Sequence, residues 1–441
     1  MRRLPPELWL LVLDHASSSG DAACLACTCR DAANAYRFSR AFRAVRVVRA
    51  STDGWIEGEL LEPASGSFDV VLTPNDVGGI GRCPREGTVL LLPGTYQGLA
   101  LSPASLDVHV FGRGQARLSS LTCSASRASF VGVNFDGAVS VFDSCLRFQR
   151  CTVQGVLLCV GNATAFDRCE LKDNVHVTAS STARFARCVF EKQTRVTRDA
   201  APVFAANTFR NGDSGFGVSV EDSRITFVSN DVQPGRPDFA FPTVGIGLNH
   251  AHDCVIERNT IGACSTGIQM VDSTAIIAGN ELWNVGTNVS LHRASRATVT
   301  GNHMRCVGNA CRGIAVSGEG TGGTFSGNAL SWHAINVLVV GPLTTLTVTD
   351  NVFRSSLIGV YFTDGQARVS ALKNNQLIDV DHPKFSLVRH RLANVAFATG
   401  VIGGVCFGRI LGLGMMGIRL LAGEFCVMVG IGAAIGACYH F

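Results

Sequence analysis

A short phrase recurs along most of this chain, and it constrains the fold more than any other feature. The phrase ends in an asparagine, one spacer residue and an apolar residue, as in VIERNTI, ATVTGNHM and LTVTDNVF. Between Asn259 and Asn375 the successive asparagines lie 21 to 26 residues apart. A repeat of this length indicates a solenoid, whose units bury their apolar faces against their neighbours. The recurring asparagines are Asn207, Asn230, Asn259, Asn280, Asn302, Asn328, Asn351 and Asn375.

The repeated units have the pattern of strands. Apolar and polar residues alternate over short runs, such as Thr298 to Thr300, and glycine or asparagine ends each run. The frame of a leucine-rich repeat is missing, and no run is long enough for a helical repeat. The sequence therefore predicts a mainly β fold, a right-handed parallel β-helix in which each coil adds about 4.8 Å to the stack.

The recurring asparagine has a structural explanation that needs no catalysis. Asparagine tolerates the left-handed bend between two strands. Stacked in register, its amide can bond to the coils above and below, as in cross-β amide ladders. Upstream, Cys151, Cys169 and Cys188 take the same place and can fill it as small apolar side chains. We expect these asparagines to form an inward ladder.

Composition narrows the function classes. Charged residues make up 16% of the chain and the formal net charge is +4, which does not imply a nucleic acid partner. The 17 cysteines suggest disulfides, but the apolar run from Leu8 to Leu13 is too short for a secretory signal. We therefore expect an intracellular, reducing compartment and free thiols. Cys24, Cys27 and Cys29 lack a second cysteine pair at zinc-finger spacing, so no metal or cofactor is expected.

Residues 1–45 show the signals of a small helical domain. Pro5 and Pro6 open a helix, and Leu8, Leu11 and Val12 share one of its faces. Asp21 can cap a second helix.

This segment resembles an F-box. The family's opening phrase appears as Leu4 to Leu8, and its later cysteine–arginine pair appears at Cys29, without the usual tryptophan. The resemblance implies docking to the adaptor subunit of a cullin–RING ubiquitin ligase, and the arginine- and alanine-rich style suits the F-box proteins of large DNA viruses. The alternative is a helical cap on the solenoid. The implied adaptor contacts are Leu4, Pro5, Leu8, Val12, Leu25 and Cys29.

A linker and cap are expected over residues 46–86, and the β-helix over residues 87–385. The opening GTVLLLPGTYQ from Gly87 resembles the first coil of pectinase-type β-helices, which implies a carbohydrate-binding or sugar-hydrolase type of repeat. Sugar hydrolysis needs paired carboxylates. The acids Asp222, Asp253, Asp272 and Asp350 are scattered near turns, so we expect no enzyme.

A substrate surface can be suggested only from histidines and arginines that recur in the later coils. They could bind acidic peptides or sugars, or they could be solvated turn residues. The candidates are His292, Arg293, His303, Arg305 and His333.

Residues 390–441 differ in composition from the rest of the chain and lack the repeat. Two glycine-rich apolar stretches flank Arg419, and each can reach the length of about 20 residues that spans a bilayer. Arg409 inside the first stretch counts against a span. We expect a membrane hairpin on the cytoplasmic face, with a cap on the last coil as the alternative.

The sequence therefore favours a non-enzymatic ubiquitin-ligase adaptor, whose β-helix holds an unidentified protein substrate. One alternative is a β-helix that binds or processes carbohydrate. Another is a membrane-tethered scaffold without a ligase role.

Overall fold

The computed structural model describes eleven segments of the chain. They are residues 45–49, 56–60, 70–72, 87–101, 108–161, 163–210, 215–233, 243–306, 311–341, 345–363 and 368–386. The expected F-box, most of the expected linker and the apolar tail lie outside them. Among the described residues there is no helix, and so none that could cross a membrane.

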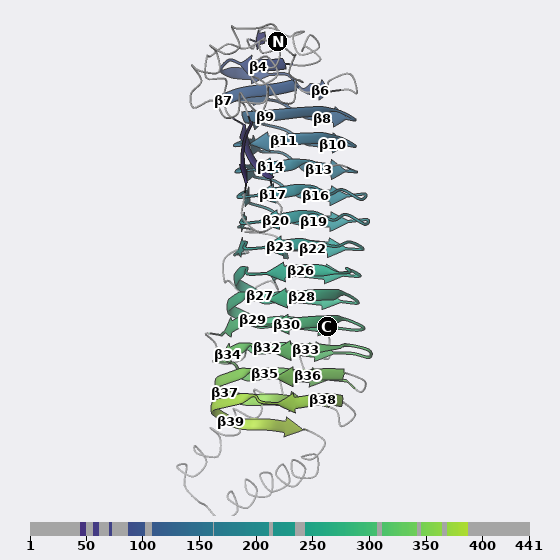
Figure 1. Ribbon diagram of the computed structural model, residues 1–441, viewed down its shortest axis with the longest axis vertical. Coiled ribbons are helices and arrows are strands. Elements are labelled where there is room, and N and C mark those ends of the chain that lie inside the picture. The colour runs from purple at the N-terminus through teal and green to yellow at the C-terminus, as the bar shows by residue number, and fades with distance from the viewer. Residues whose placement is uncertain are drawn as a thin grey trace, which may run out of the picture. The chain divides into compact units, whose positions relative to one another are not determined.

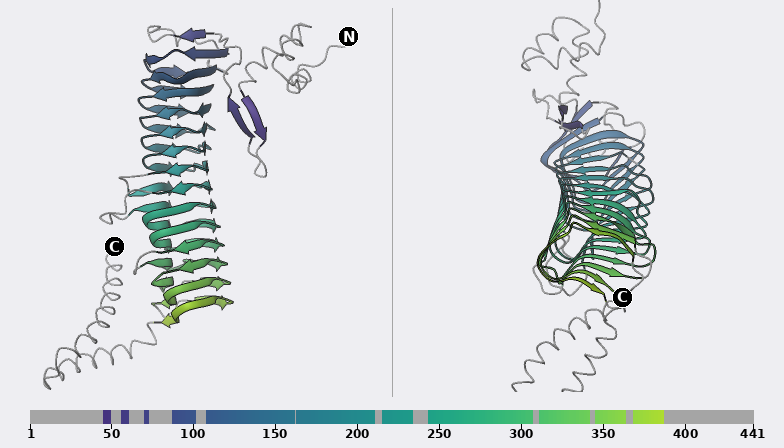
Figure 2. Two further views of the ribbon diagram at one scale, coloured as in Figure 1. Left: turned by 90° about the vertical axis from the view of Figure 1, so that its left-hand side faces the viewer. Right: turned by 60° about the horizontal axis from the view of Figure 1, so that its bottom comes forward.

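Almost all described strands belong to a right-handed parallel β-helix, in which each coil pairs with the next (Figure 1). Figure 2 shows the coils one beneath another. Strands β1 (Val45–Arg49) and β2 (Ile56–Leu60) form a separate antiparallel pair. Parallel pairing begins at β3 (Val70–Leu72), which joins β4, so it extends into the segment expected to be linker and cap.

Each coil contributes to three parallel stacks, named A, B and C in chain order. Stack A contains β6 (Leu99–Leu101), β8 (Leu121–Ser124), β10 (Val139–Phe142), β13 (Leu157–Val160), β16 (Val175–Thr178), β19 (Thr194–Thr197), β22 (Phe216–Glu221), β25 (Val244–Asn249), β32 (Arg312–Ser317) and β35 (Ile335–Val340). Stack B contains β3, β4 (Gly87–Leu91), β11 (Cys145–Gln149), β14 (Ala165–Asp167), β17 (Arg184–Ala186), β20 (Val203–Ala205), β23 (Thr226–Val228), β26 (Cys254–Glu257), β28 (Thr274–Ala278), β30 (Arg296–Thr300), β33 (Gly322–Ser326), β36 (Thr345–Thr349) and β38 (Arg368–Lys373). Stack C contains β5 (Gly94–Tyr96), β12 (Thr152–Val153), β15 (Glu170–Leu171), β18 (Val189–Phe190), β21 (Thr208–Phe209), β24 (Asp231–Val232), β31 (His303–Arg305), β34 (Ala329–Ser331) and β39 (Gln376–Ser386).

Five long strands bend around a corner and serve two stacks. β7 and β9 run from B into C, and β27, β29 and β37 run from C into A. They are β7 (Val108–Leu118), β9 (Arg127–Phe135), β27 (Thr260–Val271), β29 (Glu281–His292) and β37 (Val352–Phe362).

The core is a column of stacked side chains, because equivalent positions of successive coils lie one strand spacing apart. Phe148, Phe166 and Phe185 are fully buried in stack B, with ring centroids 4.7 and 4.8 Å apart. This separation equals the spacing expected between paired strands. Alternate residues of the same strands point outward, as the period-two pattern predicts.

All eight repeat asparagines lie in one column at the turn between stacks B and C, and Asn302 shows the pattern. Its Oδ1 accepts hydrogen bonds from the backbone N–H and the Nδ2 of Asn280, at 2.8 and 2.9 Å. Its Nδ2 donates to Oδ1 of Asn328 and to the carbonyl of Ile277, both at 2.9 Å. The column is buried for most of its length, so these bonds replace lost hydration.

The expectation that asparagine itself takes the left-handed conformation at this turn is wrong. The left-handed residue is the one before the asparagine, as at Arg258 (φ 54°) and Asp350 (φ 58°). Asparagine is therefore needed because its amide bonds to the coils on both sides, whereas the preceding residue adopts the left-handed conformation. Cys188 precedes the column, and its backbone N–H donates to Oδ1 of Asn207 at 2.8 Å.

The cysteines only partly match the expectation of free thiols. Cys306 and Cys311 form a disulfide, so the expectation is wrong for these two. Burial raises the pKa of Cys123 and of Cys264 to about 12, so both thiols stay protonated and unreactive at neutral pH. The buried cysteines of the described part that form no disulfide are Cys123, Cys151, Cys159, Cys169, Cys188, Cys254 and Cys264.

Candidate functional site

The turn from stack A to stack B gathers charged residues from successive coils. Asp222, His250, Asp272 and Arg293 each follow a stack A strand in left-handed backbone conformation, with φ between 47 and 56°. Backbone bonds place them in adjacent coils: the N–H of Asp222 reaches the residue before His250, and the N–H of His250 reaches the residue before Asp272. Three of the four acids that looked scattered in sequence therefore lie near this A–B edge, and Asp253 is the third.

One ion pair and one histidine define the chemistry of the edge. Nη1 of Arg293 lies 3.4 Å from Oδ2 of Asp272, but the arginine side chain is 70% exposed, so the pair contributes little stability. His292 lies between two serines, with Nε2 2.7 Å from Oγ of Ser290 and Nδ1 2.6 Å from Oγ of Ser317. Burial, and secondly the charge of Arg293, lowers the pKa of His292, so its imidazole is neutral at pH 7.

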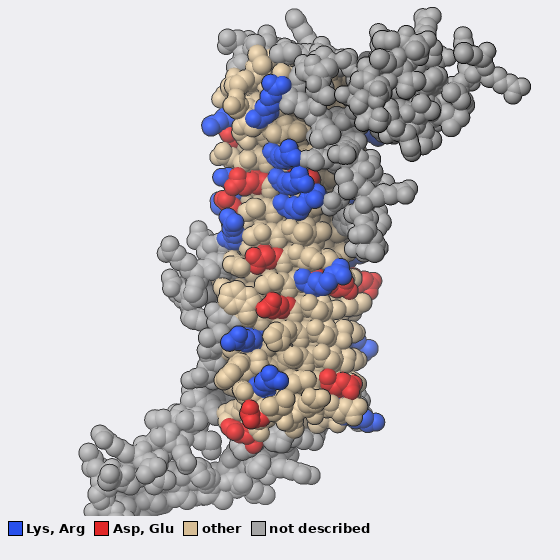
Figure 3. Space-filling model, turned by 60° about the vertical axis from the view of Figure 1, so that its left-hand side comes forward, with Lys and Arg blue, Asp and Glu red and all other residues tan. Residues whose placement is uncertain are grey.

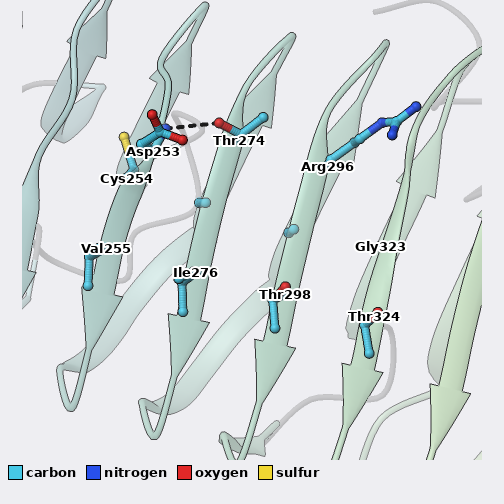
Figure 4. Close-up of a pocket in the computed structure, with 11 residues that line it drawn as sticks. Asp253, Cys254, Val255, Thr274, Ile276, Arg296, Thr298, Gly323 and Thr324 are labelled. Carbon is cyan, nitrogen blue, oxygen red and sulfur yellow. Dashed lines mark hydrogen bonds between the residues drawn. The ribbon is translucent and has the colours of Figure 1, made fainter.

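A shallow groove of about 420 Å³ opens on stack B beside this edge (Figure 4). Its floor is a row of outward side chains from four successive coils, and its rim carries Asp253, Thr274 and Arg296. The backbone N–H of Asp253 donates to Oγ1 of Thr274 at 2.9 Å, and Asp253 itself is exposed. The floor residues are Val255, Ile276, Thr298 and Thr324.

The floor of the groove is flat and amphipathic. Its side chains are β-branched and stand side by side on paired strands. Ile276 is 46% exposed, which makes it one of the few large apolar side chains at the surface of the described part. A surface of this kind can contact a ligand that combines apolar and hydroxyl-bearing faces.

The suggested substrate-face residues do not share one surface. His292 and Arg293 lie at the A–B edge, whereas His303 and Arg305 lie on β31 in stack C and are exposed. His333 is 2% exposed, and its Nε2 lies 2.6 Å from Oδ1 of the buried Asn288. A coil visits three stacks within one repeat, so residues about ten positions apart face different directions.

Two features of the site were not predicted from the sequence. The floor residues Val255, Ile276, Thr298 and Thr324 each lie four positions before a ladder asparagine, so the repeat itself could have located them. A second column, of serines, supports the A–B edge: Oγ of Ser273 accepts from the N–H of Ala251 at 3.0 Å. Its members include Ser126, Ser144, Ser273 and Ser295.

No metal cluster of three or more histidine, cysteine or acidic side chains occurs in the described segments. Cys24, Cys27 and Cys29 and the expected adaptor contacts lie outside those segments.

Part of the chain matches the model of one protein family. Residues 202–377, fewer than half of the chain, match the family NosD, described as a periplasmic copper-binding protein. No curated protein matches the chain.

The solved structures that resemble this chain in fold have low sequence identity to it. The periplasmic alginate epimerase AlgG is 11% identical with a TM-score of 0.40, covering 71% of this chain and 83% of that chain. The alginate lyase AlyF-OU02 is 12% identical with a TM-score of 0.41, covering 72% and 86%. PfbA, a surface adhesin of Streptococcus pneumoniae, is 12% identical with a TM-score of 0.36, covering 70% and 88%.

Proposed function

We propose that the β-helix binds a carbohydrate chain in the stack B groove, with the A–B edge as its polar border. The observation that carries this proposal is the groove itself, an open and shallow trough that crosses several coils. A polymer can lie along such a trough and contact one coil after another, whereas a compact ligand would need a deeper cavity.

The side chains suit a sugar ring. Ile276 and Val255 offer apolar surface to the C–H face of a pyranose, and Thr298 and Thr324 offer both a methyl and a hydroxyl group. Asp253 can accept hydrogen bonds from sugar hydroxyls, and Arg296 can donate several in a fixed geometry. Further along the border, Asp272 and Arg293 extend the same chemistry to neighbouring coils.

Arg296→Ala is expected to weaken binding of a soluble polysaccharide by at least about ten-fold, because a charge-assisted hydrogen bond contributes about 1.5–3 kcal/mol. Calorimetric titration of the full chain with a panel of neutral and acidic polysaccharides measures this. Arg210→Ala, an exposed arginine after β21, is the matched control and should change nothing.

Two results would contradict the proposal. One is the absence of binding to any member of the panel, and the other is equal affinity for the Arg296→Ala variant and the wild type. Mass spectrometry of the same mixtures reports chain cleavage, and shortened products would move the proposal from binding to catalysis.

The second candidate function is the ubiquitin-ligase adaptor, favoured by the Leu4 to Leu8 phrase. On this proposal the segment of residues 1–45 docks the adaptor subunit and the β-helix presents a bound target.

Leu8→Asp is expected to abolish adaptor binding and to leave the β-helix folded. The new carboxylate would have to be buried without a partner in the docking interface, which costs several kcal/mol. A pull-down with the purified adaptor subunit tests this, with circular dichroism as the folding control. Failure of the wild type to bind would remove this candidate.

A further inference from the structure

An aromatic and basic patch lies on stack C, away from the groove. Register pairs Trp283 with Arg305, Arg305 with Ser331, and Ser331 with Arg354. These side chains all point outward from successive strands, so the two arginines lie two strands apart with the small Ser331 between them. Paired strands are about 4.8 Å apart, so the two guanidinium groups can reach one ligand above Ser331.

Trp332, directly after Ser331, is the most exposed large apolar residue of the described part, at 58%. Its φ of 65° puts a bulky residue in left-handed conformation, and its N–H donates to the carbonyl of Arg354 at 3.1 Å. Such backbone strain costs about 1–3 kcal/mol and clusters at functional sites. Because more than half of it is exposed, this side chain buries little of its surface against the fold.

Trp283 completes the aromatic part of the patch. A Cβ added at Gly262 would lie 2.5 Å from Cε2 of Trp283, so the indole lies across the neighbouring strand, and only glycine leaves room for it there. The patch therefore offers one ring that lies along the sheet and one ring that is strongly exposed.

The charge of the two arginines is not balanced by an ion pair with any residue that the structure describes. Within the described part of the chain, neither Arg305 nor Arg354 forms a salt bridge. Among the strands that carry these side chains, β29 holds Glu281, opposite His303, and β39, which pairs with β37, adds Asp379 and Asp381. Figure 3, which brings the side of β34 and β37 forward, shows single blue and red side chains set in tan surface over the lower coils. Guanidinium groups beside the exposed indole of Trp332 suit an anion attached to a ring.

We propose that this patch binds an acidic saccharide, with the sugar ring on Trp332 and its carboxylate or sulfate between Arg305 and Arg354. The proposal deepens the proposed carbohydrate function by adding a second site on another stack. It does not use the residues of the groove, so the two sites can be tested separately.

The test uses a soluble oligouronide and the same oligosaccharide with its carboxyl groups reduced to alcohols. Binding is measured by calorimetry and by tryptophan fluorescence in the Arg296→Ala background, in which binding by the groove is weakened. The acidic probe should bind at least ten-fold more tightly than the reduced probe, and its affinity should fall with salt. Arg305→Ala should remove this preference, and Arg210→Ala should preserve it.

Trp332→Gly separates binding from folding. Glycine adopts the left-handed conformation without strain, so this variant should melt at the same or a higher temperature, while binding falls at least ten-fold. A purely structural role for the indole predicts a lower melting temperature instead.

Equal affinity for the two probes, or unchanged affinity in Trp332→Gly, would overturn the proposal. So would tighter binding of a single-stranded oligonucleotide than of the oligouronide. Absence of the acidic preference when Arg305 is intact, with neutral polysaccharide still bound by the wild type, would refute this patch alone. An absence of binding by either probe and by the whole polysaccharide panel would refute both sites.

Discussion

Replacing Asn302 with leucine is expected to destabilise the β-helix by at least about 3 kcal/mol. Leucine would leave the backbone N–H of Asn280 without a partner, and it would remove one bond each from Nδ2 of Asn280, Oδ1 of Asn328 and the carbonyl of Ile277. Oδ1 of Asn328 would keep only the bond from the backbone N–H of residue 302. Each buried polar group left unsatisfied costs about 1–3 kcal/mol. Thermal and denaturant unfolding of the variant measure the loss.

Thr300→Val is the matched control, because it removes one hydroxyl two positions away on the outward side of the same strand. Its Oγ1 accepts only a long bond, 3.4 Å, from Ser326. The control should change stability by less than 1 kcal/mol. Equal losses in the two variants would mean that the amide column does not hold the coils together.

Acidification is expected to destabilise the β-helix between pH 6.5 and 4. Burial lowers the pKa of His333 from 6.5 to about 4, against a smaller opposing effect of the nearby Asn336 amide. The folded state therefore keeps this imidazole neutral while the unfolded chain takes up a proton. Stability is complete above the unfolded value and is lost progressively down to the folded one, by about 3 kcal/mol in total. Burial shifts the pKa of His292 in the same direction.

His333→Gln isolates this effect, because glutamine can still donate to Asn288 but does not titrate in this range. Melting temperatures measured from pH 7 to pH 4 should fall less steeply for this variant than for the wild type. His303→Gln, at an exposed histidine, should follow the wild-type curve. Parallel curves for His333→Gln and the wild type would exclude His333 as a source of the acid sensitivity.

Only part of the candidate site could be predicted from the sequence. The groove floor was predictable in principle, since each floor residue lies at a fixed offset from a ladder asparagine and adjacent coils share one register. The A–B edge was harder to predict from the sequence, because turn lengths differ from coil to coil. Asp222 and Asp272 come together only when backbone bonds align the turns of three successive coils.

His333 could not have been placed from its own segment. It bonds to Asn288, 45 residues earlier, past an intervening coil that contains the Cys306–Cys311 disulfide. In sequence it looked like any other histidine near a turn, and so it was grouped with surface residues.

The sequence by itself determined the strand character, the coil length and the asparagine column, because a solenoid repeats one local rule at every coil. Only the tertiary structure decided which stack each side chain faces, which turn residue takes the left-handed bend, and which histidine is buried. These depend on where each coil turns its corners relative to the next. That relation is set by hydrogen bonds between residues about 20 positions apart, and a periodic pattern in one dimension does not contain it.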